Sequence, residues 1–235
     1  MPERSSVQQV YSVVLDRICL LKYPPHTLLR EGELAREFGM SRTPIREVFL
    51  RLALMGLVAS RNGVGTFVTG MDYLGYRDIY PLRMKVAELI GDLSPRSVTS
   101  RDIDRVVRLE ERARGLQAAF DAREYWDLNH ALHFTIGGLI GNSALRDLWD
   151  RYYYQTARIW YAIAERDAAD TAESFVAEIE GTLRGLRADD LKAVGYVQRN
   201  GIAVTMRKVM EEVNPDTGEW LREPPRLTAL RRTTG

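Results

Sequence analysis

LAREFGMSRTPIREV, residues 34–48, is the stretch that decides the fold of the N-terminal part of the chain. It predicts a short helix, a tight turn at Gly39 and a second helix with Ser41 as its N-terminal cap. Glycine suits the turn because it adopts positive φ without a steric cost. The opening turns of the second helix, the part that enters the major groove in a helix-turn-helix protein, carry Arg42, Thr43 and Arg46. The stretch therefore predicts a DNA-binding helix-turn-helix.

Apolar residues recur in this region at helical spacing, and they predict the face that packs each helix into its own domain. In the second helix they are Ile45, Val48, Phe49, Leu52 and Leu54. The same spacing predicts an earlier helix over residues 7–21, which ends before Pro24 and Pro25.

A β-hairpin is predicted directly after the second helix. Residues 57–60 and 66–69 are expected to form two short strands. Between them lies the sequence RNGVG, residues 61–65, and an Asn-Gly pair between two strands is a strong hairpin signal. Three helices followed by a hairpin predict a winged helix-turn-helix, with Arg61 near the tip of the wing.

Residues 6–70 resemble the winged-helix domain of the GntR family of repressors. The resemblance rests on Leu34-Ala35, the run from Gly39 to Glu47, the join Leu52…Gly56-Leu57-Val58, and Gly65-Thr66-Phe67-Val68. It implies DNA contacts from the second helix and from a wing glycine. Many relatives carry a basic or polar residue where Gly32 stands, so that contact is either missing here or supplied by Arg30 or Arg36. The candidate DNA-contacting residues are Arg30, Arg36, Ser41, Arg42, Thr43, Arg46, Arg61, Gly63 and Gly65.

Composition sets limits on the rest of the chain. Its 235 residues suit two modest domains, and residues 1–70 hold nine Lys/Arg against six Asp/Glu, a net +3 in a chain whose total is +1. The single cysteine, Cys19, excludes an internal disulfide, and we expect it to be a buried apolar residue. No signal peptide or membrane-length apolar run is evident, which predicts a cytoplasmic protein with no membrane partner.

The remainder of the chain is expected to be entirely helical. Helices are predicted over roughly 76–93, 99–121, 123–140, 143–166, 170–187 and 189–213. The expected domains are 1–70, a linker over 71–76, a helical domain over 77–213 and an irregular tail over 214–235. The predicted fold class is mainly α: a winged helix-turn-helix followed by an all-helical antiparallel bundle.

The helical half resembles the FCD-type ligand-sensing domain of the FadR-like branch of the same family. The resemblance covers about 76–208 and is carried by YPLRMKV (80–86), LNHALH (128–133) and GNSAL (141–145). Six helices favour the VanR-like subgroup. In this family an Asp or Asn and three histidines often hold a divalent metal that helps to bind a carboxylate ligand.

The metal motif is incomplete in this sequence. By the resemblance, Asn129 and His133 match its first two positions and Glu178 and Asn200 its last two. Of three histidines, His26 belongs to the first domain, so a three-histidine cage is excluded. Two alternatives remain: these four residues hold a divalent metal more weakly, or they form a polar cluster that contacts an organic ligand directly. No cofactor is assigned.

Arg83 is the candidate for binding the anionic group of a ligand, because a guanidinium suits bidentate recognition of a carboxylate. An ion pair with an acid on a neighbouring helix is the alternative. For Arg158 and the aromatic residues between 149 and 161 the alternatives are a place in the ligand pocket and a structural contact. Most such aromatic side chains are core or dimer contacts. The candidate effector-binding residues are Arg83, Asn129, His133, Glu178, Asn200 and Arg158.

These features together predict a ligand-responsive repressor. A homodimer would bind a palindromic operator in double-stranded DNA, and a small organic acid or related metabolite would change its operator affinity. An enzyme is not expected, since no nucleophile motif, phosphate loop or complete metal motif is present. Two alternatives stay open: a dimer whose helical domain is purely structural, and an enzyme that uses the pocket of that domain.

Overall fold

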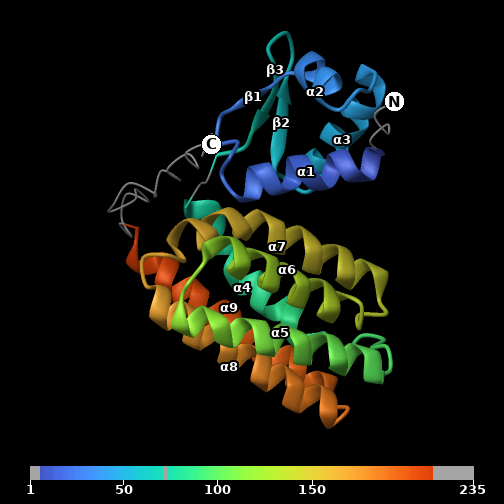
Figure 1. Cartoon of the computed structure of the whole chain (residues 1–235). Helices are drawn as coiled ribbons and strands as arrows, with labels where there is room; N and C mark the ends of the chain where they lie inside the picture. Colours follow the sequence, from blue (N-terminus) through green and yellow to red (C-terminus); the bar gives the residue numbers. More distant parts are fainter. Residues whose placement is uncertain (1–5, 71–72, 214–235) are drawn as a thin grey trace. The chain divides into compact units, whose positions relative to one another are not determined.

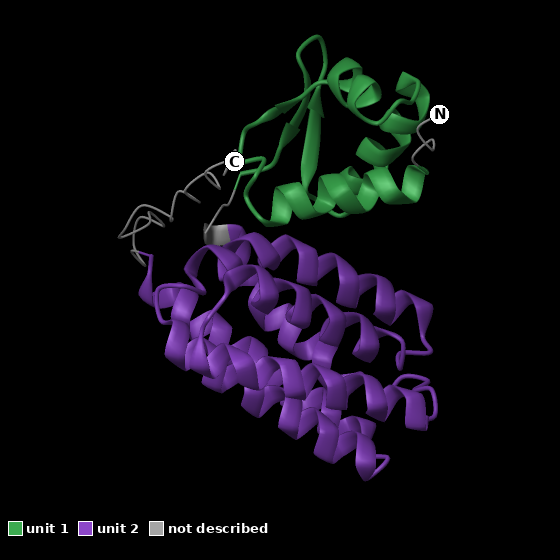
Figure 2. Ribbon diagram, viewed as in Figure 1, with its two compact units in different colours: residues 1–72, 225–235 green, residues 73–224 purple. Residues whose placement is uncertain are grey.

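The computed structural model describes residues 6–70 and 73–213, which fall into two compact units (Figure 2). The first unit ends at residue 72 and the second begins at residue 73. The predicted irregular tail over 214–235 lies outside the described residues. Within the described ranges, no helix combines the length and the apolar character that crossing a membrane requires.

The first unit is a winged helix-turn-helix, as predicted. Its elements are α1 (Val7–Cys19), β1 (Leu28–Leu29), α2 (Glu31–Glu37), α3 (Arg42–Leu54), β2 (Val58–Arg61) and β3 (Gly65–Val68) (Figure 1). The strands form an antiparallel sheet in the order β1-β3-β2. Strand β1 was not predicted, because two residues are too few for a periodic signal. It pairs Leu28 with Phe67 and so joins the start of α2 to the wing.

The core of this unit confirms most of the predicted apolar face of α3. The buried side chains are Ile45, Val48, Phe49 and Leu52, and Cys19 of α1 is buried as expected. Leu54 was expected on the same face, and that prediction is wrong, since the residue is 73% exposed. Leu54 follows Ile45 by nine residues, and at about 100° per residue this places it on the opposite side of the helix.

The second unit contains only helices in its described part. They are α4 (Tyr73–Glu88), α5 (Ser100–Ala118), α6 (Ala122–Gly137), α7 (Ser143–Ile163), α8 (Ala168–Arg187) and α9 (Leu191–Glu211). Their number agrees with the predicted six, and the whole chain is mainly α. Residues 73–76, which were expected in the linker, are helical because α4 begins at Tyr73. Helix α4 packs against α7 and α9, and α8 packs against α5 and α9.

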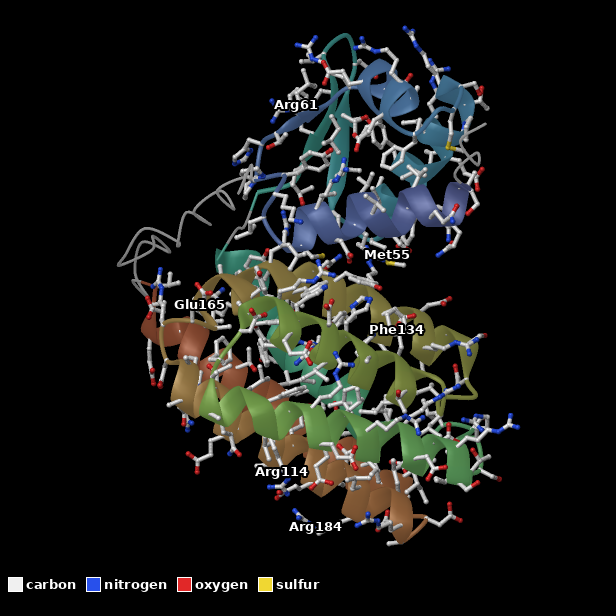
Figure 3. All side chains as sticks on the ribbon, in the orientation of Figure 1. Met55, Arg61, Arg114, Phe134, Glu165 and Arg184 are labelled. Atoms are coloured by element: carbon white, nitrogen blue, oxygen red, sulfur yellow. The ribbon has the colours of Figure 1, made fainter. Side chains whose placement is uncertain are left out.

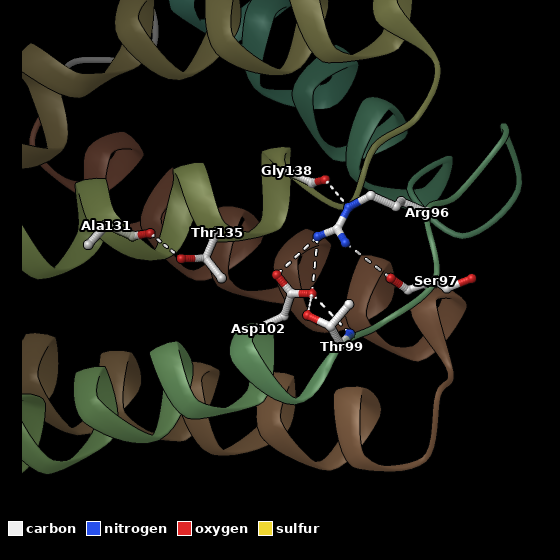
Figure 4. A network of polar contacts seen from close by, with 7 residues as sticks. All are labelled: Arg96, Ser97, Thr99, Asp102, Ala131, Thr135 and Gly138. Atoms are coloured by element: carbon white, nitrogen blue, oxygen red, sulfur yellow. Dashed lines mark hydrogen bonds and ion pairs between the residues drawn. The ribbon is translucent and has the colours of Figure 1, made fainter.

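A polar network around the buried Asp102 connects the start of α5 to the end of α6 (Figure 4). Arg96 donates to both carboxylate oxygens of Asp102, at 3.0 and 3.1 Å, and from Nε to the carbonyl of Gly138 at 2.8 Å. Thr99 donates to Asp102 from its backbone N–H and its hydroxyl. Burial alone would raise the pKa of Asp102, but the bonds from Thr99 and Arg96 outweigh it and lower this pKa.

Two glycines in this unit give opposite expectations. A Cβ on Gly195 of α9 would lie 2.5 Å from the carbonyl oxygen of Ala87 in α4, whereas a Cβ on Gly115 of α5 would meet nothing within 4 Å. Gly195→Ala should therefore lower the free energy of unfolding by about 1–3 kcal/mol, because α4 and α9 must separate. Gly115→Ala should raise it by about 0.5–1 kcal/mol, because alanine reduces the freedom of the unfolded chain.

The measurement is the urea midpoint followed by tryptophan fluorescence. The tryptophans of the described residues all lie in the second unit, so the signal reports its unfolding. Equal midpoints for the two variants would contradict the close packing of α4 on α9.

Candidate functional site

The first candidate surface is the exposed side of α3. Arg42, Thr43 and Arg46 are exposed on its opening turns, while Ile45 between them is fully buried. The preceding turn has Gly39 at φ 62°, as predicted. Ser41 is the N-cap residue, but the cap hydrogen bond predicted for its hydroxyl is not formed. The helix therefore presents three polar side chains on the face directed away from its own core.

Helix α2 and the start of α3 border a hollow of about 710 Å³ on the surface. Arg30, Arg36, Ser41 and Arg42 line it, and so does Gly32. A Cβ on Gly32 would lie 3.6 Å from Nη2 of Arg42, which is ordinary van der Waals contact. The guanidinium of Arg42 thus lies beside the backbone of α2 at Gly32, on the same surface as Arg30 and Arg36.

The wing contributes Arg61 at the end of β2, which Figure 3 labels on the hairpin. Its guanidinium carbon lies 5.9 Å from the centre of the Phe67 ring. Gly63 and Gly65 have φ of 74° and 132°, values that favour glycine. Both glycines are explained by the backbone of the turn alone, so their contact with DNA stays a prediction.

Arg46 is held by an acid from the neighbouring helix. Its Nε lies 3.0 Å from both carboxylate oxygens of Glu31 in α2. The hydrogen bond from Glu31 raises the pKa of Arg46, and the guanidinium remains exposed to solvent. Glu31 therefore orients Arg46 and also cancels part of the charge that this surface offers to a phosphate.

Glu31→Gln is expected to raise affinity for DNA of unrelated sequence by roughly two- to fivefold, because one negative charge leaves the surface. Discrimination between operator and unrelated DNA should fall, because Arg46 loses its fixed orientation. Fluorescence anisotropy with both kinds of duplex measures the two changes. Glu111→Gln in α5 removes the same charge from the second unit and should leave both affinities unchanged. If Glu31→Gln instead lowers the affinity for unrelated DNA, the assignment of Arg46 and its surface to DNA binding is contradicted.

The second candidate site is a pocket of about 360 Å³ among α6, α7, α8 and α9. A smaller chamber of about 30 Å³ adjoins it, a space that holds about two water molecules or one small polar group. The pocket and the chamber share the lining residues Tyr125, Asn129, Trp160, Glu178, Gly201 and Thr205. Asn200, Arg184 and Lys208 line only the pocket, whereas Arg83, His133 and Gln198 line only the chamber. Figure 3 labels Arg184 on the outer side of α8.

Five of the six predicted effector residues thus line one space or both, and Arg158 lines neither. Arg158 is buried, with 2% exposure, and its Nη2 lies 3.5 Å from the hydroxyl of Tyr76. Its placement on α7 turns it toward α4 and away from the pocket, so we withdraw it from the candidate set.

Arg83 is buried in the chamber, with 7% exposure. Its Nη1 donates to Thr156 Oγ1 at 2.9 Å, and its guanidinium carbon lies 5.5 Å from the centre of the Tyr153 ring. Arg83 forms no ion pair within 4 Å among the described residues, and Glu178 of α8 acts on it through its charge without such a contact. The Nε of Arg83 has no hydrogen-bond partner among the described residues. A buried donor of this kind is ready for an incoming acceptor.

His133 is held rigidly between two rings. Trp149 and Tyr153 stack on it at centroid distances of 4.8 and 3.9 Å, and its Nε2 lies 2.8 Å from Asp150 Oδ1. Burial lowers the pKa of His133 to about 4, although Asp150 opposes this. The neutral ring therefore donates from Nε2 to Asp150 and leaves Nδ1 as an acceptor, which has no partner among the described residues.

Glu178 lies at the junction of the pocket and the chamber. Burial raises the pKa of its carboxyl to about 7, against the lowering effects of Arg83 and of a hydrogen bond from Gln198. Gln198 is buried in turn and donates to Thr182 Oγ1 at 3.1 Å. Glu178 is therefore part of a connected polar cluster and not an isolated surface acid.

These donors do not fit the metal site that the resemblance implied. His133 uses Nε2 for Asp150, and the cationic Arg83 faces the same chamber and would repel a metal ion. Asn200 lines the pocket but not the chamber, so the four predicted ligands do not converge on one space. Within the described ranges, no group of three or more His, Cys, Asp and Glu could hold a metal ion.

Tyr125, Gln198 and Lys208 are among the polar lining residues that sequence reasoning missed. Tyr125 precedes Asn129 by four residues, and Asn129 precedes His133 by four, so helical spacing could have placed it on the same face. Lys208 follows Gly201 by seven, which is again one face of a helix. Gln198 carried no such signal, because its burial depends on how α8 and α9 pack.

Comparisons with known proteins agree with both halves of this description. A family model described as bacterial regulatory proteins, gntR family, matches residues 6–68, and the FCD domain model matches residues 78–200. The chain is 24% identical to the Exu regulon transcriptional regulator of Escherichia coli strain K12 over 202 residues, 79% of this chain and 77% of that protein.

Two further relatives are regulators as well. The chain is 27% identical to the probable D-xylose utilization operon transcriptional repressor of Paenarthrobacter nicotinovorans over 168 residues, 71% of this chain and 74% of the relative. It is 30% identical to an HTH-type transcriptional regulator of Streptomyces ambofaciens over 144 residues, 59% of this chain and 58% of that relative. The chain thus matches less than two thirds of the Streptomyces protein.

Solved structures share the fold. E. coli McbR/YncC aligns with a TM-score of 0.72 at 18% identity over 89% of this chain and 100% of that one. A GntR transcriptional regulator from Rhodococcus sp. RHA1 aligns with a TM-score of 0.67 at 17% identity over 88% of this chain and 99% of that one. A winged helix followed by a matched FCD domain shows that this chain belongs to the gntR family of bacterial transcriptional regulators.

Proposed function

We propose that the protein is a cytoplasmic transcriptional repressor whose operator affinity changes when a small organic acid binds in the pocket of the helical unit. The observation that carries this proposal is Arg83, a buried guanidinium with an unpartnered Nε in a chamber that adjoins a pocket of about 360 Å³. An arginine buried without a carboxylate partner is costly to the folded state, and a bound anion would compensate it.

The DNA-binding half of the proposal rests on α3. Arg42, Thr43 and Arg46 are exposed where a recognition helix reads base edges, and Arg61 with the wing would contact the backbone or minor groove. Two copies of the chain would bind a palindromic operator, because a symmetric dimer presents two identical recognition helices. One relative is named as a probable repressor, which supports repression as the direction of control.

Helix α4 supports a route between the two functions. It begins at Tyr73, directly after the first unit, and carries Arg83 on the same continuous helix. A ligand that binds Arg83 acts on this helix, and it alters operator affinity if it prefers one of two arrangements of α4. The pocket also favours this proposal over a purely structural helical domain, which would need no such space.

The test begins with selection of an operator from a random pool of double-stranded DNA by the full chain. Native mass spectrometry of the complex then counts chains per duplex, and two chains on one palindromic site are expected. Failure to enrich any sequence would contradict the proposal, and so would one chain per selected duplex.

A further inference from the structure

Glu178 is an acid in the ligand pocket, and it restricts the chemical groups of a ligand in a way that Arg83 alone does not. It is the only acidic residue lining the pocket or the chamber in the described part of the chain. The other charged side chains that line these spaces are the cations Arg83, Arg184 and Lys208. Glu178 lines both spaces, so a ligand that extends from the pocket to Arg83 crosses the junction at which this carboxyl lies.

The position of Glu178 is built into the packing of α8 on α9. A Cβ on Gly201 of α9 would lie 2.5 Å from Oε2 and 3.2 Å from Oε1 of Glu178. Glycine at this position thus leaves the space that the carboxyl occupies, and the buried Gln198 of the same helix, which donates to Thr182, lines the chamber beside it. The packing of α9 at Gly201 therefore leaves room for the acid at the junction of pocket and chamber.

A plain carboxylate bound at Arg83 would face this acid unfavourably. Two ionised carboxyl groups in a poorly solvated space repel each other, so a plain carboxylate would bind at the cost of protonating Glu178. A methylene chain would also leave the ionised Glu178 without the hydrogen bonds that it can accept. A ligand with a donor beside its carboxylate avoids both costs. Asn129 lines pocket and chamber, Asn200 lines the pocket, and their amides supply further donors and acceptors for such a group.

We infer that the effector is a carboxylic acid that also carries a hydrogen-bond donor, a hydroxyl or an ammonium group, which Glu178 accepts while Arg83 binds the carboxylate. This inference rests on the proposed function. The pKa of Glu178, raised to about 7 by burial, supports it, because a bound donor stabilises the ionised carboxyl that burial disfavours.

The test uses matched five-carbon acids with the full chain: pentanoate, 2- and 5-hydroxypentanoate, and 2- and 5-aminopentanoate. Calorimetry gives the affinity of each for the wild type. At least one donor-bearing acid is expected to bind roughly tenfold or more tightly than pentanoate, since a hydrogen bond to a charged group has about this effect. A hydroxy acid or an amino acid as the tighter ligand identifies which donor the site takes.

Three variants separate this role of Glu178 from a merely structural one. Glu178→Gln should lower the affinity for the donor-bearing acid at least about tenfold. Its affinity for pentanoate should equal or exceed that of the wild type, because the repulsion between carboxylates is removed. Gly201→Ala should change both affinities in the same directions, because its Cβ displaces the carboxyl of Glu178. Glu180→Gln removes an acid two residues away on α8 that pairs with Arg114 outside the pocket, and should change neither affinity.

The outcomes distinguish this inference from the proposed function. Equal binding of pentanoate and the donor-bearing acids, unaltered by Glu178→Gln, would overturn the inference and leave acid sensing intact. If none of the five acids binds and none changes operator affinity, the proposed function is overturned, and the inference with it.

Discussion

Replacing Arg42 or Arg46 by alanine is expected to weaken binding to the selected operator by roughly 10- to 100-fold, the loss typical of one good base contact. Both side chains are exposed on the first turns of α3. The buried Ile45 and Val48 hold the helix against the core of the unit, whereas the two arginine side chains are exposed to solvent. Their removal should change DNA affinity and leave the fold intact.

The two variants should lose sequence preference at different positions of the operator. Arg42 lies beside Gly32 and forms no ion pair among the described residues, whereas Arg46 is paired with Glu31. We expect Arg42→Ala to relax the sequence preference at one position of each half-site, and Arg46→Ala to relax it at another. Selection from a random pool with each variant measures this directly.

Lys22→Ala is the matched control for these variants. It removes one exposed positive charge from the same unit without touching α3, and should weaken operator binding only through the general salt-dependent term. If Lys22→Ala loses as much affinity as Arg42→Ala, α3 is not the recognition helix.

Arg83→Gln is expected to lower the affinity for the effector acid by roughly 10- to 100-fold, because charge-assisted hydrogen bonds between its carboxylate and a buried guanidinium are lost. Operator affinity without acid should stay at the wild-type value. Glutamine keeps a donor for Thr156, which Arg83 contacts at 2.9 Å, so the helical unit should remain folded. Calorimetry with the tightest of the five acids measures the change.

Arg77→Gln provides the control on the same helix. Arg77 is exposed near the start of α4 and pairs with Asp78, so its loss should not alter acid binding. Unchanged acid affinity in Arg83→Gln would show that the ligand binds elsewhere, and the chamber would then be an internal polar cluster only.

The local elements could be predicted because their signals lie within a few residues of one another. Gly39, Ser41 and the spacing of Ile45, Val48 and Leu52 define the helix-turn-helix, and each acts over one or two turns. Strand β1 could not be predicted because it has only two residues and is defined by its pairing with β3, which is far away in the sequence. Leu54 was misplaced because an apolar residue was assigned to the core without regard to its angle around α3.

The pocket was predictable only in part. Asn129 and His133 share one face of α6, but their meeting with Glu178 and Arg83 depends on how α4, α6 and α8 pack together. The pairing of His133 with Asp150 is such a long-range contact, and it changes the chemistry by occupying Nε2. Arg158 could not be told from Arg83 in the sequence, because both are arginines within helical apolar surroundings.

The most direct test of the account is the operator dissociation constant of the wild-type protein, measured by fluorescence anisotropy without acid and with the acid at saturation. We predict that the acid weakens operator binding by about 5- to 150-fold, the usual range of coupling between two sites. An unchanged dissociation constant, with the acid shown by calorimetry to be bound, would contradict the claim that the helical unit controls DNA binding.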